Sequence, residues 1–120
     1  MILKNQVHMP PQCPPVGAIP GNVSPVYRFI ENEKLEEIDF QNHIERKRPY
    51  PPNKTCEALA ISFFTSTQSA RNMSKKFKTF RNKTLLAGKI TTECGRHQTQ
   101  HQHLNLWLYE NVDMVKIFQG

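Results

Sequence analysis

The stretch ALAISFF at residues 58–64, followed by TST at residues 65–67, carries the strongest structural signal in the chain. Its nearly unbroken apolar character predicts a buried strand. The three hydroxyl side chains behind it can cap a helix that begins at once. That helix is expected over residues 68–80, where Ala70, Met73, Phe77 and Phe80 share one face. A buried strand leading into an amphipathic helix predicts a domain of mixed α and β structure.

The segments on either side of this unit are predicted to be mainly strands. Residues 26–30 are rich in β-branched and aromatic side chains, and they predict a strand upstream. A short helix is expected around residues 32–40, with Asn32 as its cap. Downstream, strands are expected at 84–92, with a bulge at Gly88, and at 97–109 and 112–118. The predicted fold is therefore a small single α+β domain with a mainly antiparallel sheet and one main helix near residues 68–80.

The first 25 residues form a separate segment by composition. Six of the nine prolines lie there, at positions 10, 11, 14, 15, 20 and 25. Proline lacks the backbone donor that helices and inner strands need, so this segment is expected to be an extended arm or a disordered tail. The sequence thus predicts a proline-rich arm over 1–25 and one α+β domain over 26–120. A second proline cluster at residues 49–53 predicts a loop.

Composition narrows the class of protein. A chain of 120 residues fits one domain, and its net charge of +6 favours anionic partners. No apolar run reaches the length of about 20 residues that spans a bilayer, so no membrane span is expected. The N-terminus lacks a signal-peptide pattern, which predicts a cytoplasmic protein. The odd number of cysteines, Cys13, Cys56 and Cys94, and their wide spacing predict reduced core thiols.

A basic stretch in the second half of the chain is a candidate nucleic-acid surface. Cations dominate residues 71–96, where Glu93 is the only acid. Such a surface can meet phosphates of nucleic acid or an acidic protein, although lysines on a helix are more often plain solubilising residues. The residues expected to make this contact are Lys75, Lys76, Lys78, Arg81 and Lys83.

A row of histidines in the predicted strand 97–109 is a second candidate site. Alternate residues of a strand share a face, so His97, His101 and His103 are expected to converge opposite Leu104, Leu106 and Leu108. Such a row can hold a metal ion, or supply an acid and a base for RNA cleavage. It can also be no more than a polar strand face.

A dispersed pattern of residues is the third candidate. Arg28 lies on the first predicted strand, Ser62 to Ser66 lead from a strand into a helix, and Glu110 follows a late strand. This order resembles that of ADP-ribosyltransferases, in which an early arginine, a serine-containing strand and a late catalytic glutamate occur in sequence. The resemblance covers roughly residues 26–118 and implies that NAD is the cofactor.

The resemblance also implies a role for each residue. Arg28 would bind the phosphates of NAD, and Ser62 or Ser66 its ribose. Phe63 or Phe64 would stack on the nicotinamide ring. Glu110 would stabilise the positive charge that develops as the glycosidic bond breaks, or orient the acceptor. Apart from the resemblance, the predicted strand face from His97 to Asn105 is expected to border the same cleft, with His97 and Asn105 beside the cofactor and His101 and His103 as further catalytic groups.

Plainer alternatives remain at the same residues. Arg28 can simply pair with Glu31 or Glu110, and Ser62 can be a small core residue. The leading hypothesis is an ADP-ribosyltransferase-like protein that modifies a macromolecular acceptor, of the kind found among toxin-like or phage-encoded effectors. The alternative from another class is a non-enzymatic basic module that binds nucleic acid or an acidic protein.

Overall fold

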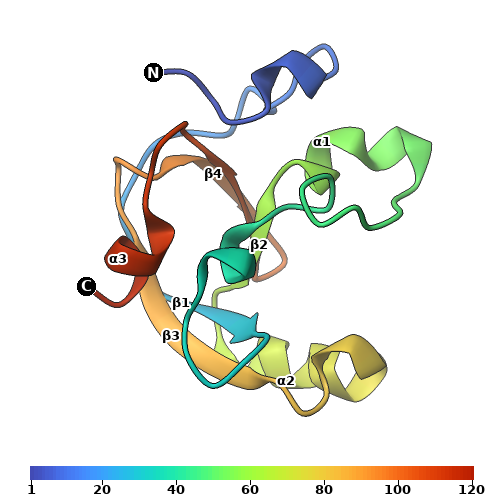
Figure 1. Ribbon diagram of the computed structural model, residues 1–120, viewed down its shortest axis with the longest axis vertical. Helices are drawn as coiled ribbons and strands as arrows, with labels where there is room; N and C mark the ends of the chain where they lie inside the picture. The colour runs from blue at the N-terminus through green and yellow to red at the C-terminus, as the bar shows by residue number, and fades with distance from the viewer.

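The computed structural model describes residues 1–120 and shows a five-stranded antiparallel sheet with a few short helices (Figure 1). The predicted α+β class is confirmed. The strand order across the sheet is β3-β1-β2-β5-β4. The strands are β1 (Val23–Ile30), β2 (Ile61–Phe64), β3 (Thr84–Ile90), β4 (Gly95–Gln100) and β5 (His103–Leu108). The α-helices are α1 (Thr55–Ala58), α2 (Thr67–Lys76) and α3 (Met114–Phe118), and the 3₁₀ turns are η1 (Gln6–His8), η2 (Glu37–Phe40), η3 (Pro52–Lys54) and η4 (Lys78–Phe80).

The strand-to-helix unit is close to its prediction. β2 occupies the central position of the sheet, although residues 55–58 before it form the short helix α1. Ser66 caps α2, because its side chain accepts a hydrogen bond from the backbone N–H of Ser69 at 3.1 Å. The helix ends at Lys76, and residues 78–80 continue as the separate turn η4. The predicted main helix is thus present but shorter than 68–80.

The prediction of one strand over residues 97–109 is wrong. The chain turns back at His101 and Gln102, which both have positive φ (52° and 64°), so β4 and β5 form a hairpin. Because His97 pairs with Leu106 and Gln100 with His103, the turn exchanges the faces of odd and even residues. His97 therefore lies on the face of the leucines, while His103 lies on the other face. The turn has neither Asn-Gly nor Asp-Gly, the usual signal for it.

Three other local predictions are also wrong. Residues 114–118 form the helix α3 in place of a strand. Asp113 caps this helix, and Met114 and Phe118 form its buried side. The predicted helix around 32–40 is reduced to η2, whose cap is Glu36 and not Asn32. β3 is continuous through Gly88, and the irregular pairing lies on β1 between Val23 and Val26. Gly88 serves packing, because a Cβ there would lie 2.5 Å from the ring of Phe118.

The N-terminal arm is an ordered strap across the sheet. Leu3 pairs with Tyr109, and Ile19 pairs with His97, so the arm crosses the edge of the β4–β5 hairpin. In Figure 1 the arm, in dark blue, crosses the top of the molecule before it descends into β1. β1 begins at Val23, so residues 23–25, which were predicted to belong to the arm, already lie in a strand that pairs with β3.

The prediction of three reduced thiols is wrong for two of them. Cys13 of the arm and Cys56 of α1, which are 43 positions apart in the sequence, form a disulfide, while Cys94 is a buried free thiol. The pairing depends on how the arm folds back, which the spacing of cysteines does not reveal. Disulfides are commonest in oxidising compartments. The cytoplasmic location stays a prediction.

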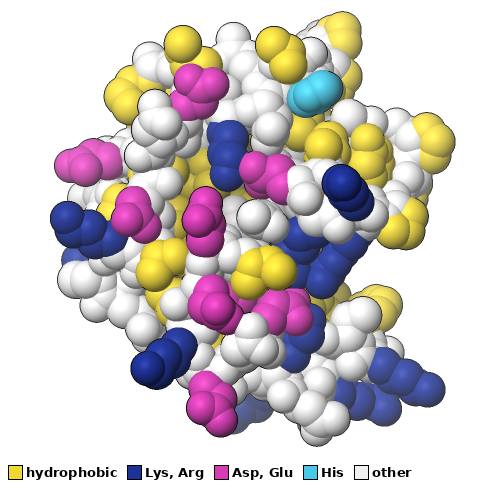
Figure 2. Space-filling model, viewed as in Figure 1, with side chains coloured by type: hydrophobic (Ala, Val, Ile, Leu, Met, Phe, Trp, Pro, Cys, Tyr) yellow, Lys and Arg dark blue, Asp and Glu magenta, His cyan; other side chains and the backbone are white.

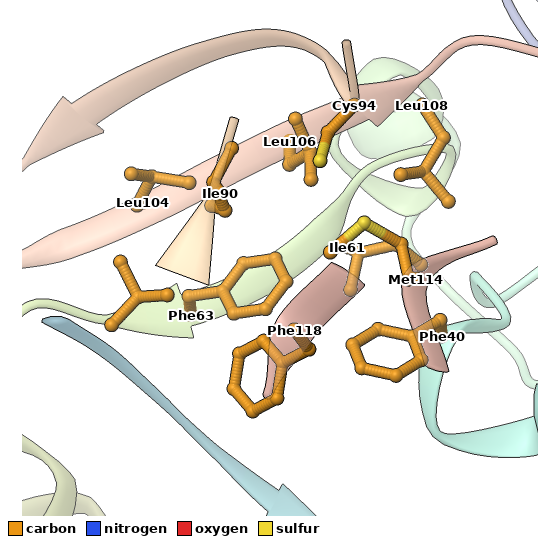
Figure 3. Packing of buried hydrophobic residues seen from close by; sticks show 11 residues of the cluster. Phe40, Ile61, Phe63, Ile90, Cys94, Leu104, Leu106, Leu108, Met114 and Phe118 are labelled. Carbon is orange, nitrogen blue, oxygen red and sulfur yellow. The ribbon is translucent and has the colours of Figure 1, made fainter. Parts of the chain in front are cut away.

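The sheet buries apolar side chains on both of its faces. On one face, Phe63 packs against Phe118 and Phe40, with ring centroids 5.9 and 6.4 Å away (Figure 3). The cluster is completed by Val26, Ile61, Ile90, Cys94, Leu104, Leu106, Leu108 and Met114. On the other face, Trp107 is buried by Leu3, Ala18, Leu59 and Ala60, and its indole N–H donates to the carbonyl of Cys56 at 3.0 Å.

None of the helices combines the length and the apolar character that a membrane span requires.

Candidate functional site

A cleft with both charged and aromatic lining lies where β1 and β2 separate. The two strands pair through Tyr27 and Phe64, and the rest of β1 diverges toward the loop that follows it. The cleft opens beside this gap, between the loop of residues 41–49 and the α2–η4 segment. Its volume of about 540 Å³ falls in the range typical of small-molecule sites.

Arg28 fills the gap between the two strands. Its guanidinium donates to the carbonyl oxygens of Ser62 on β2 and Asp39 on η2, and it lies 5.7 Å from the centre of the Phe63 ring. These bonds replace the strand pairing that the divergence removes. Burial, followed by repulsion from Arg46, lowers the pKa of Arg28 to about 10, so the side chain stays charged at neutral pH. Arg28 thus contributes structure and positive charge at the base of the cleft.

Glu31 gathers three cations at one wall of the cleft. One of its carboxylate oxygens, Oε1, lies 2.8 Å from Lys83 Nζ, 2.8 Å from Arg46 NH1 and 3.5 Å from Arg48 NH2. The hydrogen bond from Lys83 is the main cause that lowers the pKa of Glu31 to about 2, against the opposing effect of burial. One carboxylate therefore faces three cations, and Arg28 adds a fourth nearby.

Arg46 has an unused donor in this site. Its side chain is 9% exposed, and two of its nitrogens donate to Glu31 and to the carbonyl of Ile38. The third nitrogen, Nε, is buried with no hydrogen-bond partner. Arg46 lines the cleft, and buried donors in native proteins almost always have a partner, so the unpaired Nε points to an acceptor that the protein itself does not supply.

Two buried polar residues hold the cleft loop in place. Asp39 accepts hydrogen bonds from the backbone N–H groups of Glu31 and Glu36, both at 2.8 Å. Asn42 exchanges bonds with Glu45, with Asn42 N–H donating to the carboxylate and Glu45 N–H to the amide oxygen. Its amide also donates to Asn5 of the arm at 2.9 Å. The cations that follow in the loop are thus anchored to the rest of the fold.

Three phenylalanines form an aromatic wall of the cleft. Phe29 stacks on Phe80 with ring centroids 5.1 Å apart, and Phe64 meets both rings edge to face. All three line the cleft, together with His103, whose ring lies 5.7 Å from that of Phe64. Such a surface suits the face of a planar base.

Two histidines, His43 and His103, line the same cleft. Burial lowers the pKa of both imidazoles below the usual 6.5. Repulsion from Arg28 contributes to both shifts, and Arg48 and Arg46 add to that of His43, whereas a hydrogen bond with Asn105 opposes that of His103. Both rings therefore lie within electrostatic reach of one guanidinium.

The charge of the cleft is strongly one-sided. Its charged lining consists of Arg28, Arg46, Arg48 and Lys83 against Glu31. In Figure 2, Lys and Arg side chains surround the indentation at the right of the molecule, and others lie below it toward α2. A concave site with excess positive charge attracts anions, and phosphate is the common biological one.

The structure brings together several residues of the predicted site. Arg28, Ser62, Phe64 and His103 all line the cleft. Asn105 lies next to it, because its side-chain oxygen accepts a hydrogen bond from the hydroxyl of Ser62 at 3.2 Å.

Other predicted residues lie elsewhere. Glu110 is exposed beyond the far end of β5, a strand about 17 Å long whose opposite end carries His103. His97 contacts the carbonyl of Gly21 through Nε2 at 3.1 Å, and His101 is exposed in the hairpin turn. Ser66 caps α2, while Phe63 is fully buried in the core. The three histidines therefore do not form a row, and no cluster of three metal-ligating side chains is present.

The predicted basic surface is divided between the cleft and its rim. Lys83 lines the cleft, whereas Lys75 and Lys76 on α2, Lys78 on η4 and Arg81 directly after η4 are exposed.

The sequence reasoning missed the roles of His43, Arg46, Arg48 and Glu31. The signal was the dense run of charge at residues 43–48, directly before a proline cluster. Comparison of the chain with protein-family models, with curated proteins and with solved structures found no match.

Proposed function

We propose that the cleft binds a phosphate-bearing nucleotide, the class of ligand to which NAD belongs. The observation that carries the proposal is the buried, unpaired Nε of Arg46, in a cleft where four cations face one carboxylate. Phosphate oxygens supply the acceptors that such a site lacks, and arginine pairs with them through two parallel hydrogen bonds.

The aromatic wall supports a nucleotide over a bare anion. Phe29, Phe64 and Phe80 lie in the same cleft as the cations. A nucleotide has a planar base and a phosphate group, so its two ends match the two kinds of lining. A cleft of about 540 Å³ has room for a ligand of this size.

NAD is the nucleotide that the ADP-ribosyltransferase resemblance implies. The positions of Arg28, Ser62 and Phe64 on the cleft support NAD as a ligand. The transfer step gains no such support from Glu110, which lies beyond the other end of β5. The proposal is therefore one of nucleotide binding, with ADP-ribosyl transfer as a reaction that the resemblance alone suggests.

Calorimetric titration tests this proposal with ADP, NAD and adenosine as ligands. We expect ADP and NAD to bind, and adenosine to bind at least about 10-fold more weakly, because a charge-assisted hydrogen bond contributes about 1.5–3 kcal/mol. Arg48→Ala should weaken ADP binding by a similar factor, because Arg48 lines the cleft. Its side chain is 48% exposed, so its loss does not disturb the core.

The matched control is Lys116→Ala, which removes one exposed positive charge on α3, away from the cleft. It should leave ADP affinity within about 2-fold of the wild type. Equal binding of adenosine and ADP, or equal loss in the two variants, would contradict a phosphate site in the cleft.

A further inference from the structure

The strongest unexplained feature of the cleft is its pair of imidazoles. His43 comes from the loop after η2, and His103 comes from the first position of β5. They line one cleft with Arg28, Arg46 and Arg48, and nothing in nucleotide binding itself needs two titratable rings there. Paired titratable groups beside a phosphate site can act as an acid and a base.

A basic rim extends the phosphate site beyond the size of one nucleotide. Met73 and Thr79 of the α2–η4 segment line the cleft, and the exposed cations Lys75, Lys76 and Lys78 belong to the same segment. A strand of nucleic acid with one nucleotide in the cleft can place its neighbouring phosphates along this rim. A polynucleotide therefore uses more of the basic surface than a free nucleotide does.

We propose that the cleft cleaves single-stranded RNA, with His43 and His103 as the acid–base pair. The inference rests on the proposed nucleotide site and names its substrate and reaction. RNA carries its own nucleophile, the 2′-hydroxyl, so two imidazoles and a cationic phosphate pocket are sufficient for the chemistry.

The reaction balances without a further reactant. The 2′-oxygen attacks phosphorus, and the neutral imidazole of His103 takes the 2′-hydroxyl proton. The bond from phosphorus to the 5′-oxygen breaks, and protonated His43 gives its proton to that oxygen. The products are a 2′,3′-cyclic phosphate and a free 5′-hydroxyl, and proton exchange with water restores both rings. Arg46 and Arg48 stabilise the negative charge that grows on the phosphoryl oxygens.

The roles follow from the surroundings of each ring. The ring of His103 is partly buried beside the ring of Phe64, which keeps the imidazole neutral and suits it to act as the base. His43 is the more exposed of the two rings, and a bound phosphate beside it raises its proton affinity and suits it to act as the acid. The charged groups that face the pair across the cleft are Arg28, Arg46, Arg48, Lys83 and Glu31.

The direction of the pKa shifts predicts the pH profile. Both rings have pKa values lowered from 6.5, so at pH 7 the acid form is scarce in the free protein. The cleavage rate, as kcat/KM, should therefore rise as the pH falls from 7 and pass through a maximum below 6.5 before the base is protonated too.

The experiment uses two labelled 12-mers in EDTA, one all-deoxy and one with a single internal ribonucleotide. Anisotropy measures binding of the all-deoxy strand, and gel analysis with mass spectrometry measures cleavage of the other. We expect both strands to bind, and cleavage only after the ribonucleotide, with a cyclic phosphate end. His43→Gln and His103→Gln should keep the binding constant within about 2-fold and slow cleavage by about 100-fold or more.

His8→Gln is the matched control, because His8 is exposed on η1, outside the cleft, and it should cleave like the wild type. His103→Asn serves as a second variant if His103→Gln loses its fold by circular dichroism. Binding without cleavage, or cleavage that survives both cleft substitutions, would overturn the RNA proposal and leave the nucleotide site standing. If neither strand binds and ADP does not bind either, the nucleotide site is overturned as well.

Discussion

The two ends of the central sheet are built in different ways. At one end, the arm, α1 and α3 close over the strands, and Trp107 and Phe118 are at most 2% exposed. At the other end, β1 and β2 diverge from the Tyr27–Phe64 pair toward Ile30 and Ile61, and charged side chains occupy the space between them. The closed end has the composition of a core. The open end has a guanidinium, Arg28, where a core would have an apolar side chain.

This difference separates stability from function in the molecule. Burial of apolar surface is the main favourable term in folding, whereas a partly buried ion pair contributes little because desolvation offsets its attraction. A cluster of four cations with one acid is therefore a poor way to stabilise a small domain. The proposed nucleotide site would account for its presence beside Phe29, Phe64 and Phe80. Substitutions at the two ends should accordingly differ in size and in what they affect.

The largest effect on stability is expected at the closed end. Phe118→Ala removes a ring that is 1% exposed and that packs on Phe40 and Phe63 at 5.5 and 5.9 Å. We expect the free energy of unfolding to fall by about 3–5 kcal/mol, as measured by urea denaturation. The matched control is Phe77→Ala, because Phe77 is 49% exposed, and its loss should be within about 1 kcal/mol. Equal losses for the two variants would contradict the assignment of the core.

A smaller, pH-dependent effect is expected at the open end. Glu31→Gln removes the acid that Lys83, Arg46 and Arg48 share, and we expect a loss of about 1 kcal/mol at pH 7, reduced by solvent screening. The folded-state pKa of Glu31 is lowered from 4.5 to about 2. Its contribution is therefore complete above pH 4.5, and it disappears as the pH falls toward 2.

Urea denaturation of the wild type and Glu31→Gln over this pH range measures the difference. Glu110→Gln is the control, since Glu110 is exposed and has no ion-pair partner. A difference between wild type and Glu31→Gln that stays constant from pH 7 to pH 2 would show that the ion cluster does not act as described.

Local features of the fold could be predicted from the sequence. The unit β2–α2 was foreseen with a cap among Thr65, Ser66 and Thr67, of which Ser66 is the one used, because an apolar run and a hydroxyl cap act within a few residues. The α+β class followed from the same pattern. By contrast, the bond between Cys13 and Cys56 depends on the path of the arm, which local propensity does not determine.

The hairpin shows how one local error changes a predicted site. A two-residue turn at His101 and Gln102 moved His97 to the face opposite His103, so the expected row of histidines does not exist. Residues 97–102 are all polar, so no change in an apolar pattern marks the turn, and the sequence pattern alone does not reveal the exchange of faces.

The cleft was only partly predictable for a related reason. Arg28, Ser62 and Phe64 were named from their order along the chain, and they do line the cleft. Arg46 and Arg48 were visible only as charge in a loop, because their convergence on Glu31 depends on contacts across 15 and 17 residues of sequence. Tertiary placement, and not residue type, turns these cations into a candidate site.

The most direct test of the central claim follows the side-chain Nε–H resonance of Arg46 by NMR during titration with ADP. This N–H is buried and has no partner in the protein, so a bound phosphate would be its first hydrogen-bond acceptor. We predict that the resonance shifts with a saturable dependence on ADP, together with backbone signals of residues 43–48 and Lys83. A resonance that stays unchanged while ADP saturates the protein, or shifts confined to Lys75, Lys76 and Lys78 on the rim, would contradict the account.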